Sequence, residues 1–158
     1  METLLKAVDA LNLQAVWFWP NNDAGTGEMA KAVRVWRELG KLRHNKIKFV
    51  TDVLPDDFVA ILRQSRCLVG NSSSGIKECS YLGVPVVNVG SRQEGRLRGP
   101  NVMDVPDEKR AIIKAVERQM RHGPYPRSDI YYKPKTSERI VEILEKIPLV
   151  AQKKFFEV

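Results

Sequence analysis

Apolar residues recur along this chain in two alternating patterns, one typical of helices and one typical of buried strands. The stretch 2–13 is apolar on one side at helical spacing, which predicts a short amphipathic helix. Short apolar runs bounded by turn residues predict buried strands at 15–19, 47–50, 67–69 and 84–89. Helical spacing elsewhere predicts helices at about 27–42, from 56 onward, up to 82, at about 107–121 and at about 137–147.

The alternation of strands and helices predicts the fold class. Strands separated by helices at short spacing favour a parallel sheet covered on both faces. Right-handed crossovers make this a doubly wound, Rossmann-like α/β domain. The chain shows no repeat, low-complexity tract or evident linker, so we expect one domain over residues 1–158. Ligands of such sheets bind at the carboxyl ends of the strands, where the loops 20–27, 51–55, 70–76 and 90–99 lie.

Composition narrows the class of protein. Of the 158 residues, 43% are hydrophobic and 28% charged, which is typical of a soluble globular domain. No apolar run approaches the roughly 20 residues that cross a bilayer, and residues 1–10 lack the features of a signal peptide. We therefore expect a cytoplasmic protein with no membrane partner. The net charge of +7 favours anionic partners, but aromatic residues do not alternate with the basic ones, so we expect no nucleic acid.

The cysteines and histidines form no recognisable metal or catalytic group. Cys67 and Cys79 match no metal or redox spacing and lie in apolar stretches, so we expect two small buried thiols. His44 and His122 have no evident carboxylate or cysteine partner. We expect neither a metal ion nor a cofactor.

Three arginines lie close together in the loop at 90–99, where the single acid is Glu94. They are Arg92, Arg96 and Arg98. The basic residues between 31 and 41 are explained as the solvated face of a helix, but those of this loop are not. Because the loop follows a predicted strand, its charge favours an anionic ligand at the carboxyl edge of the sheet.

The segment from Gly70 to Gly75 is the strongest local signal for binding. It reads Gly-Asn-Ser-Ser-Ser-Gly and joins a predicted strand to a predicted helix. Small residues let the backbone approach a ligand, and free N–H groups with serine hydroxyls suit an anion such as phosphate. The segment matches neither the Walker loop nor the G-x-G-x-x-G fingerprint. An ordinary serine cap of a helix gives the same pattern and is the alternative.

Glu78 follows the serines by about one helical turn. A carboxylate at this position can accept hydrogen bonds from the vicinal hydroxyls of a ribose, as acidic residues do in dinucleotide sites. A phosphate site beside a ribose site indicates a nucleotide. The alternative is an acid that is favoured in the first turn by the helix dipole alone.

Five ordered motifs resemble the UDP-N-acetylglucosamine 2-epimerases. Three are central, and segments upstream and downstream also fit, so that the likeness runs from about residue 15 to 147. They are Trp19–Gly25, Gly70–Glu78, Leu82–Gly90, Arg92-Gln93-x-Gly95-Arg96 and Gly99–Val102. The resemblance implies the C-terminal half of a two-lobed fold of glycosyltransferase-B type, with UDP held mainly by this half.

The resemblance also implies roles for individual residues by their position. The serine segment matches the part that binds the diphosphate, with a basic residue nearby, and the glutamate matches the ribose-binding acid. A loop upstream closes on the ligand, and the loop at 52–54 receives the uracil through backbone groups. The residues concerned are Asn21, Val53, Ser72, Ser73, Ser74, Gly75, Glu78 and Arg92.

The Asn-Ser-Ser form and the Arg-Gln-x-Gly-Arg motif look more like the hydrolysing branch, which yields UDP and free N-acetylmannosamine. The catalytic carboxylates and histidine of the family have no counterpart here, so we expect no catalytic residue and no activity from this chain alone. The implied partners are UDP or UDP-N-acetylglucosamine, an N-terminal lobe, and a second copy in a homodimer. Two alternatives remain: a glycosyltransferase lobe, although its usual Glu-x7-Glu spacing is absent, and a non-catalytic module that binds UDP-sugars.

Overall fold

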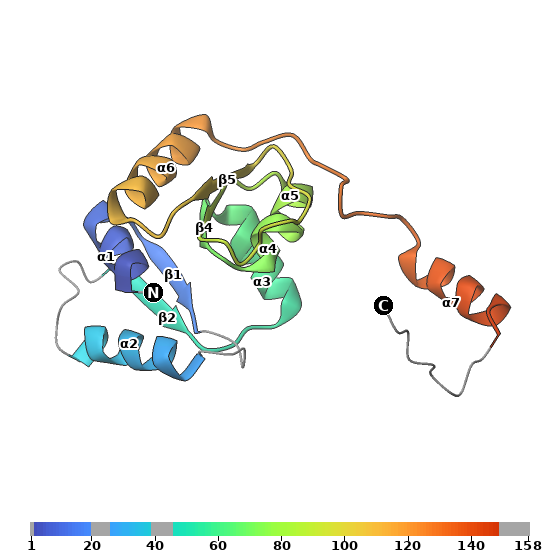
Figure 1. Cartoon of the computed structure of the whole chain (residues 1–158), viewed down its shortest axis with the longest axis horizontal. Helices are drawn as coiled ribbons and strands as arrows, with labels where there is room; N and C mark the ends of the chain where they lie inside the picture. Colours follow the sequence, from blue (N-terminus) through green and yellow to red (C-terminus); the bar gives the residue numbers. More distant parts are fainter. Residues whose placement is uncertain (1, 20–25, 39–45, 149–158) are drawn as a thin grey trace, which may run out of the picture.

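The structure is a computed structural model that describes residues 2–19, 26–38 and 46–148 (Figure 1). From residue 2 to residue 89 helices and strands alternate as the sequence predicts, except that two short helices follow one another at 73–82. In chain order they are α1 (Glu2–Leu11), β1 (Ala15–Phe18), α2 (Thr26–Glu38), β2 (Ile47–Val50), α3 (Pro55–Gln64), β3 (Leu68–Gly70), α4 (Ser73–Ile76), α5 (Glu78–Leu82), β4 (Val86–Val89), β5 (Val102–Val105), α6 (Lys109–His122) and α7 (Thr136–Lys146).

The strand pairs in the described ranges are all parallel, and they form two sheets rather than the one continuous sheet that we expected. β1 pairs with β2 over four residues. β4 lies between β3 and β5 in the second sheet and is buried along its whole length. A strand covered on both faces needs apolar residues on both, which explains the unbroken apolar character of this segment.

Helices cover the second sheet on both faces. Val87 and Val89 of β4 pack with α6 and with Ala7 of α1. Val86, whose side chain points to the opposite face, packs with Leu62 of α3 and with residues of α5. Figure 1 shows α1 and α6 side by side, away from α3, α4 and α5. The sheet is therefore doubly wound.

Helix α1 joins the two sheets. Ala7 lies in the core around β4, and Leu5 lies in a separate core with Val33 and Trp36 of α2. Trp17 and Phe49, from β1 and β2, pack against that second core, with ring centroids 6.3 Å apart. The predicted apolar side of this helix therefore faces two cores rather than one.

Two features of local structure differ from the prediction. Residues 102–105 form β5, where the sequence predicted no strand. The predicted single helix after the serines is two short helices, because the backbone at Lys77 departs from helical geometry with φ −93° and ψ −74°. Gly83 ends α5 with φ +69°, and a Cβ there would lie 2.1 Å from the carbonyl oxygen of Tyr125. Glycine is therefore required at this turn.

Helix α7 forms where the sequence predicts it, but it stands apart from the body of the protein (Figure 1). It follows an extended segment after α6, and none of its residues is buried. None of the helices in the described ranges is long and apolar enough to span a bilayer.

Candidate functional site

Ser72 of the segment Gly70–Gly75, here called the serine loop, caps helix α4. The Ser72 hydroxyl accepts a hydrogen bond from the backbone N–H of Ser74, with 3.3 Å between nitrogen and oxygen. The structural reading of this serine as a helix cap is therefore correct, and it does not exclude a ligand, because a hydroxyl that accepts one hydrogen bond can still donate another. Ser72 is exposed, whereas Ser73 and Ser74 are half-buried.

Gly75 brings α4 against the sheet. A Cβ at this position would lie 2.8 Å from Cγ1 of Val86 and 3.2 Å from Cδ2 of Leu68. The residue is buried. Close packing of the helix on β3 and β4 is thus sufficient reason for a glycine here, whether or not a ligand also approaches its backbone.

The loop after β4 contacts the serine loop directly, as expected of loops that follow neighbouring parallel strands. The side-chain amide of Gln93 donates to the carbonyl oxygen of Asn71 at 2.7 Å. The guanidinium of Arg92 approaches the same oxygen at 3.5 Å. Gln93 is 2% exposed, and its Oε1 has no hydrogen-bond partner within the described part of the chain. Sequence reasoning gave Gln93 no role, yet it joins the two loops.

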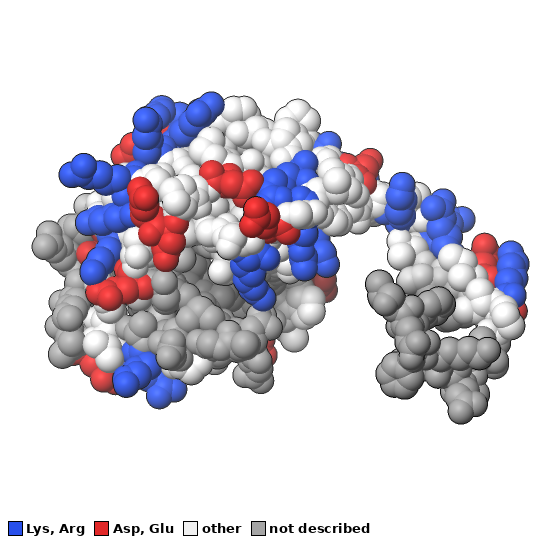
Figure 2. Space-filling view, viewed as in Figure 1, with Lys and Arg blue, Asp and Glu red and all other residues white. Residues whose placement is uncertain are grey.

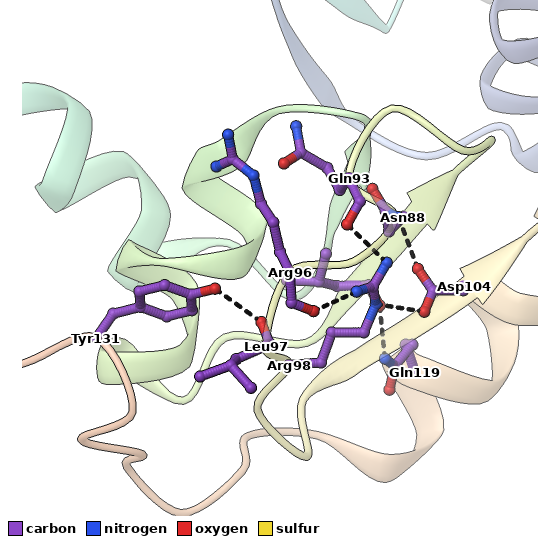
Figure 3. A network of polar contacts seen from close by, with 9 residues as sticks. Asn88, Gln93, Arg96, Leu97, Arg98, Asp104, Gln119 and Tyr131 are labelled. Atoms are coloured by element: carbon purple, nitrogen blue, oxygen red, sulfur yellow. Dashed lines mark hydrogen bonds and ion pairs between the residues drawn. The ribbon is translucent and has the colours of Figure 1, made fainter. Parts of the chain in front are cut away.

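The three arginines of this loop have different roles. Arg98 donates from Nε to Asp104 at 2.6 Å and from Nη2 to the carbonyl oxygen of Gln93 at 2.9 Å. It also donates from Nη1 to the carbonyl oxygen of Arg96 (Figure 3). Asp104 lies on β5 and also accepts from Asn88 at 2.6 Å. Arg98 therefore holds the loop in shape, so part of the positive charge noted in the sequence of this loop is used within the fold.

Charge is mixed on the face that Figure 2 shows. Lysine and arginine side chains alternate there with aspartate and glutamate, so the net charge of +7 is not gathered into one basic surface on that face.

Glu78 is the first residue of α5, and its side chain is exposed. It borders a pocket of about 500 Å³ whose walls come from α3, α5 and the segment before α7. The remaining lining residues are Val59, Arg63, Lys77, Tyr81, Leu82, Tyr131 and Tyr132. The ribose role of Glu78 remains a prediction. The two tyrosines lie far from Glu78 in sequence, and sequence reasoning missed them.

The other two predicted site residues are less informative. Val53 is half-buried, and its backbone N–H donates to the Asp52 carboxylate at 2.9 Å. This hydrogen bond shapes the turn before α3, and it occupies a donor that a uracil could otherwise use. Asn21 lies outside the described residues.

Burial makes both thiols poorly reactive. Desolvation raises the pKa of Cys67 and of Cys79 to about 12, in the second case with a contribution from the nearby Glu78 carboxylate. Cys79 is fully buried and Cys67 is half-buried. His122 stacks on Tyr125 with 3.8 Å between ring centroids, and His44 lies outside the described ranges. No cluster of three potential metal ligands occurs among the residues that were placed.

Comparison with known proteins identifies the family. The family model for UDP-N-acetylglucosamine 2-epimerase matches residues 1–145. This chain belongs to the UDP-N-acetylglucosamine 2-epimerase family. The resemblance inferred from the five motifs is thereby confirmed.

Relatives within the epimerase family are longer than this chain. A hydrolysing UDP-N,N'-diacetylbacillosamine 2-epimerase from Legionella pneumophila is 32% identical over 96% of this chain and 39% of its own length. A UDP-N-acetylglucosamine 2-epimerase from Neisseria meningitidis is 28% identical over 96% of this chain and 40% of its own. The chain thus spans about two fifths of these relatives.

The fold is that of an epimerase of known structure. UDP-N-acetylglucosamine 2-epimerase from Methanocaldococcus jannaschii, crystallised with UDP-GlcNAc and UDP, superposes with a TM-score of 0.66 at 19% identity. The match covers 91% of this chain and 39% of that one. The predicted Rossmann-like fold, resembling one half of a glycosyltransferase-B-type fold, is confirmed, whereas the roles of individual residues remain predictions.

Proposed function

We propose that this chain binds UDP, and UDP-N-acetylglucosamine through its UDP part, as the nucleotide-binding portion of a UDP-N-acetylglucosamine 2-epimerase. The observation that carries the proposal is the junction at Asn71, where the loop bearing Arg92 and Gln93 meets the serine loop. Serine hydroxyls and a guanidinium gather there, which are groups that proteins use to bind phosphate.

In the proposed arrangement the diphosphate and the ribose of UDP bind to two neighbouring groups of residues. Ser72, Ser73 and Ser74, with Arg92, bind the diphosphate. Glu78 accepts hydrogen bonds from the ribose hydroxyls at the mouth of the pocket that it borders. The uracil is assigned to the turn at Val53, and Asn21 to a loop that closes on the ligand. These two assignments rest on the resemblance alone.

The chemistry of the complete enzyme is also part of the proposal. Loss of the proton at C2 and anti elimination of UDP would give a glycal, to which water then adds. The donors at the Asn71 junction would stabilise the charge that develops on the departing diphosphate. By the resemblance, the base and the acid that act on the C2 proton are assigned to the N-terminal lobe of the complete enzyme, because the family's catalytic carboxylates and histidine have no counterpart in these motifs. The motif forms favour the hydrolysing reaction, with N-acetylmannosamine as the second product.

Calorimetry with UDP, uridine and ADP tests the nucleotide site. We expect UDP to bind more tightly than uridine, with the difference narrowing as salt rises, because exposed charge contacts are screened. ADP should bind less tightly than UDP if the turn at 52–54 recognises the uracil. Arg92→Gln should lower the affinity for UDP and leave the affinity for uridine nearly unchanged. Arg118→Gln, on the exposed side of α6, should change neither affinity. Equal affinity of the parent chain for uridine and UDP would contradict the phosphate role of the junction.

A further inference from the structure

Residues 124–132, here called the tyrosine strap, connect α6 to the region before α7 and are held against α5. The backbone N–H of Tyr125 donates to the carbonyl oxygen of Gly83 at 2.8 Å. The backbone N–H of Ser128 donates to the carbonyl oxygen of Ser80 at 2.9 Å. The strap therefore follows the surface of α5, the helix that begins with Glu78.

Arg127 holds the strap to α5 through aromatic rings. Its guanidinium carbon lies 4.0 Å from the ring centroid of Tyr81 and 4.7 Å from that of Tyr132. The two ring centroids are themselves 4.7 Å apart, with a tilt of 35°. Asp129 accepts from Nε of the same guanidinium at 2.6 Å, which fixes its orientation. One cation thus contacts a ring of α5 and a ring of the strap, an arrangement stabilised by cation–π attraction.

Tyr131 ties the strap to the loop that carries the arginines. Its hydroxyl donates to the carbonyl oxygen of Leu97 at 2.9 Å (Figure 3). Tyr131 and Tyr132 are each 38% exposed, although both are held in place by specific contacts. Both line the pocket that Glu78 borders, together with the apolar side chains of Val59 and Leu82. The strap therefore supplies aromatic surface to a pocket whose other walls come from α3 and α5.

We propose that Tyr131 and Tyr132 bind the nucleoside part of the ligand and that Arg127 is the residue that positions them. The proposal rests on the nucleotide-binding function proposed above and adds binding residues to it. A ribose held by Glu78 would lie at the mouth of a pocket with aromatic and apolar walls. Planar bases and the carbon face of a ribose both pack favourably on such walls.

The tyrosine substitutions can be tested by their effect on two ligands at once. We expect Tyr131→Ala and Tyr132→Ala to lower the affinities for uridine and for UDP by the same factor, about 5- to 150-fold, the range for removal of an aromatic contact to a nucleoside. The ratio of the two affinities should stay constant, because the lost contact is to the nucleoside that both ligands share. Arg92→Gln serves as the contrasting variant, since it should lower the UDP affinity alone.

Conservative variants separate ring contact from folding. Tyr132→Phe keeps the ring and should bind both ligands like the parent chain. Tyr132→Leu keeps apolar bulk without a ring, so it provides a folded variant if the alanine change unfolds the protein, and it should still lose affinity. Tyr131→Phe removes the hydrogen bond to Leu97 and should cost less than Tyr131→Ala.

The positioning role of Arg127 is tested with the ratio of the UDP and uridine affinities. Arg127→Gln should lower both affinities by the same factor. Arg127→Lys should recover part of the loss, because an ammonium also binds aromatic faces. Arg118→Gln is the matched control. If the tyrosine and Arg127 variants lose thermal stability but bind both ligands like the parent chain, the strap only supports the fold and our inference is wrong. If the parent chain binds neither ligand, the proposed function itself has failed, and the two failures are thereby distinguished.

Discussion

Replacing Arg98 by methionine should lower the thermal stability of the chain while leaving its preference for UDP over uridine in place. The substitution removes one ion pair to Asp104 and two hydrogen bonds to the carbonyl oxygens of Gln93 and Arg96. Buried hydrogen bonds to a charged group are worth about 1.5–3 kcal/mol each. The side chains of Arg98 and Asp104 are 25% and 48% exposed, so solvent screening reduces the total. We expect a loss of about 1–3 kcal/mol, or roughly 2–12 °C in the midpoint of thermal unfolding.

Scanning calorimetry measures the midpoint, and titration with UDP and uridine measures binding in the same variants. Arg96→Met is the matched control, because only the backbone of Arg96 takes part in this network, and it should unfold like the parent chain. In a double-mutant cycle with Asp104→Asn, the two changes should be less than additive, because either one breaks the ion pair. If the Arg98→Met variant unfolds like the parent chain but loses affinity for UDP and keeps its affinity for uridine, Arg98 contacts the phosphates and our interpretation is refuted.

Three further predictions concern the site and the thiols. Glu78→Gln should weaken the binding free energy of UDP by about 1.5–3 kcal/mol and change the free energy of unfolding little. Glu94→Gln should leave UDP binding unchanged. Equal UDP titration curves for the two variants would argue against the ribose role of Glu78. The free energy of unfolding should fall as pH rises from 9.0 to about 12, because the unfolded thiols ionise near 9.0 and the folded ones near 12. The slope of this fall approaches about 1.4 kcal/mol per pH unit for each thiol. The double variant Cys67→Ala with Cys79→Ala should show a flatter dependence on pH. Incubation of this chain with UDP-N-acetylglucosamine in heavy water should give neither deuterium at C2 nor free UDP above background, because an acid and a base must lie within hydrogen-bond reach of the sugar; deuterium incorporation abolished by Glu94→Gln would show that the catalytic groups were misplaced.

Local periodicity predicted most helices and strands because the burial that creates each pattern involves neighbours in sequence. The unbroken apolar run of β4 indicated a strand covered on both faces, and α6 and α1 cover one of them. β5 was missed because its four residues are only half-buried or exposed and follow directly on a loop. The break at Lys77 was missed because it is a departure of one residue's backbone angles inside a sequence that is otherwise compatible with a helix.

The contact between the serine loop and the arginine loop was also within reach of the sequence. Both loops follow strands, and the carboxyl ends of parallel strands that pair lie side by side. β3 does pair with β4, and Gln93 reaches Asn71 across the gap between their loops. The pocket wall at Tyr131 and Tyr132 could not be foreseen in this way. It depends on where an irregular segment lies, and no periodic pattern specifies that.

The arginines of the loop at 90–99 show why the type and spacing of residues predict a site only in part. Arg92, Arg96 and Arg98 are alike in sequence, and together they indicated an anion site. Arg98 differs because Asp104, on the neighbouring strand β5, lies 2.6 Å from its guanidinium. A cation with a carboxylate partner and two carbonyl partners is already neutralised and oriented, so a phosphate gains little from it. Because the pairing of β4 with β5 brings Asp104 beside this loop, and two loop carbonyls complete the set of partners, the charge that a loop offers to a ligand depends on these contacts and not on the number of its arginines.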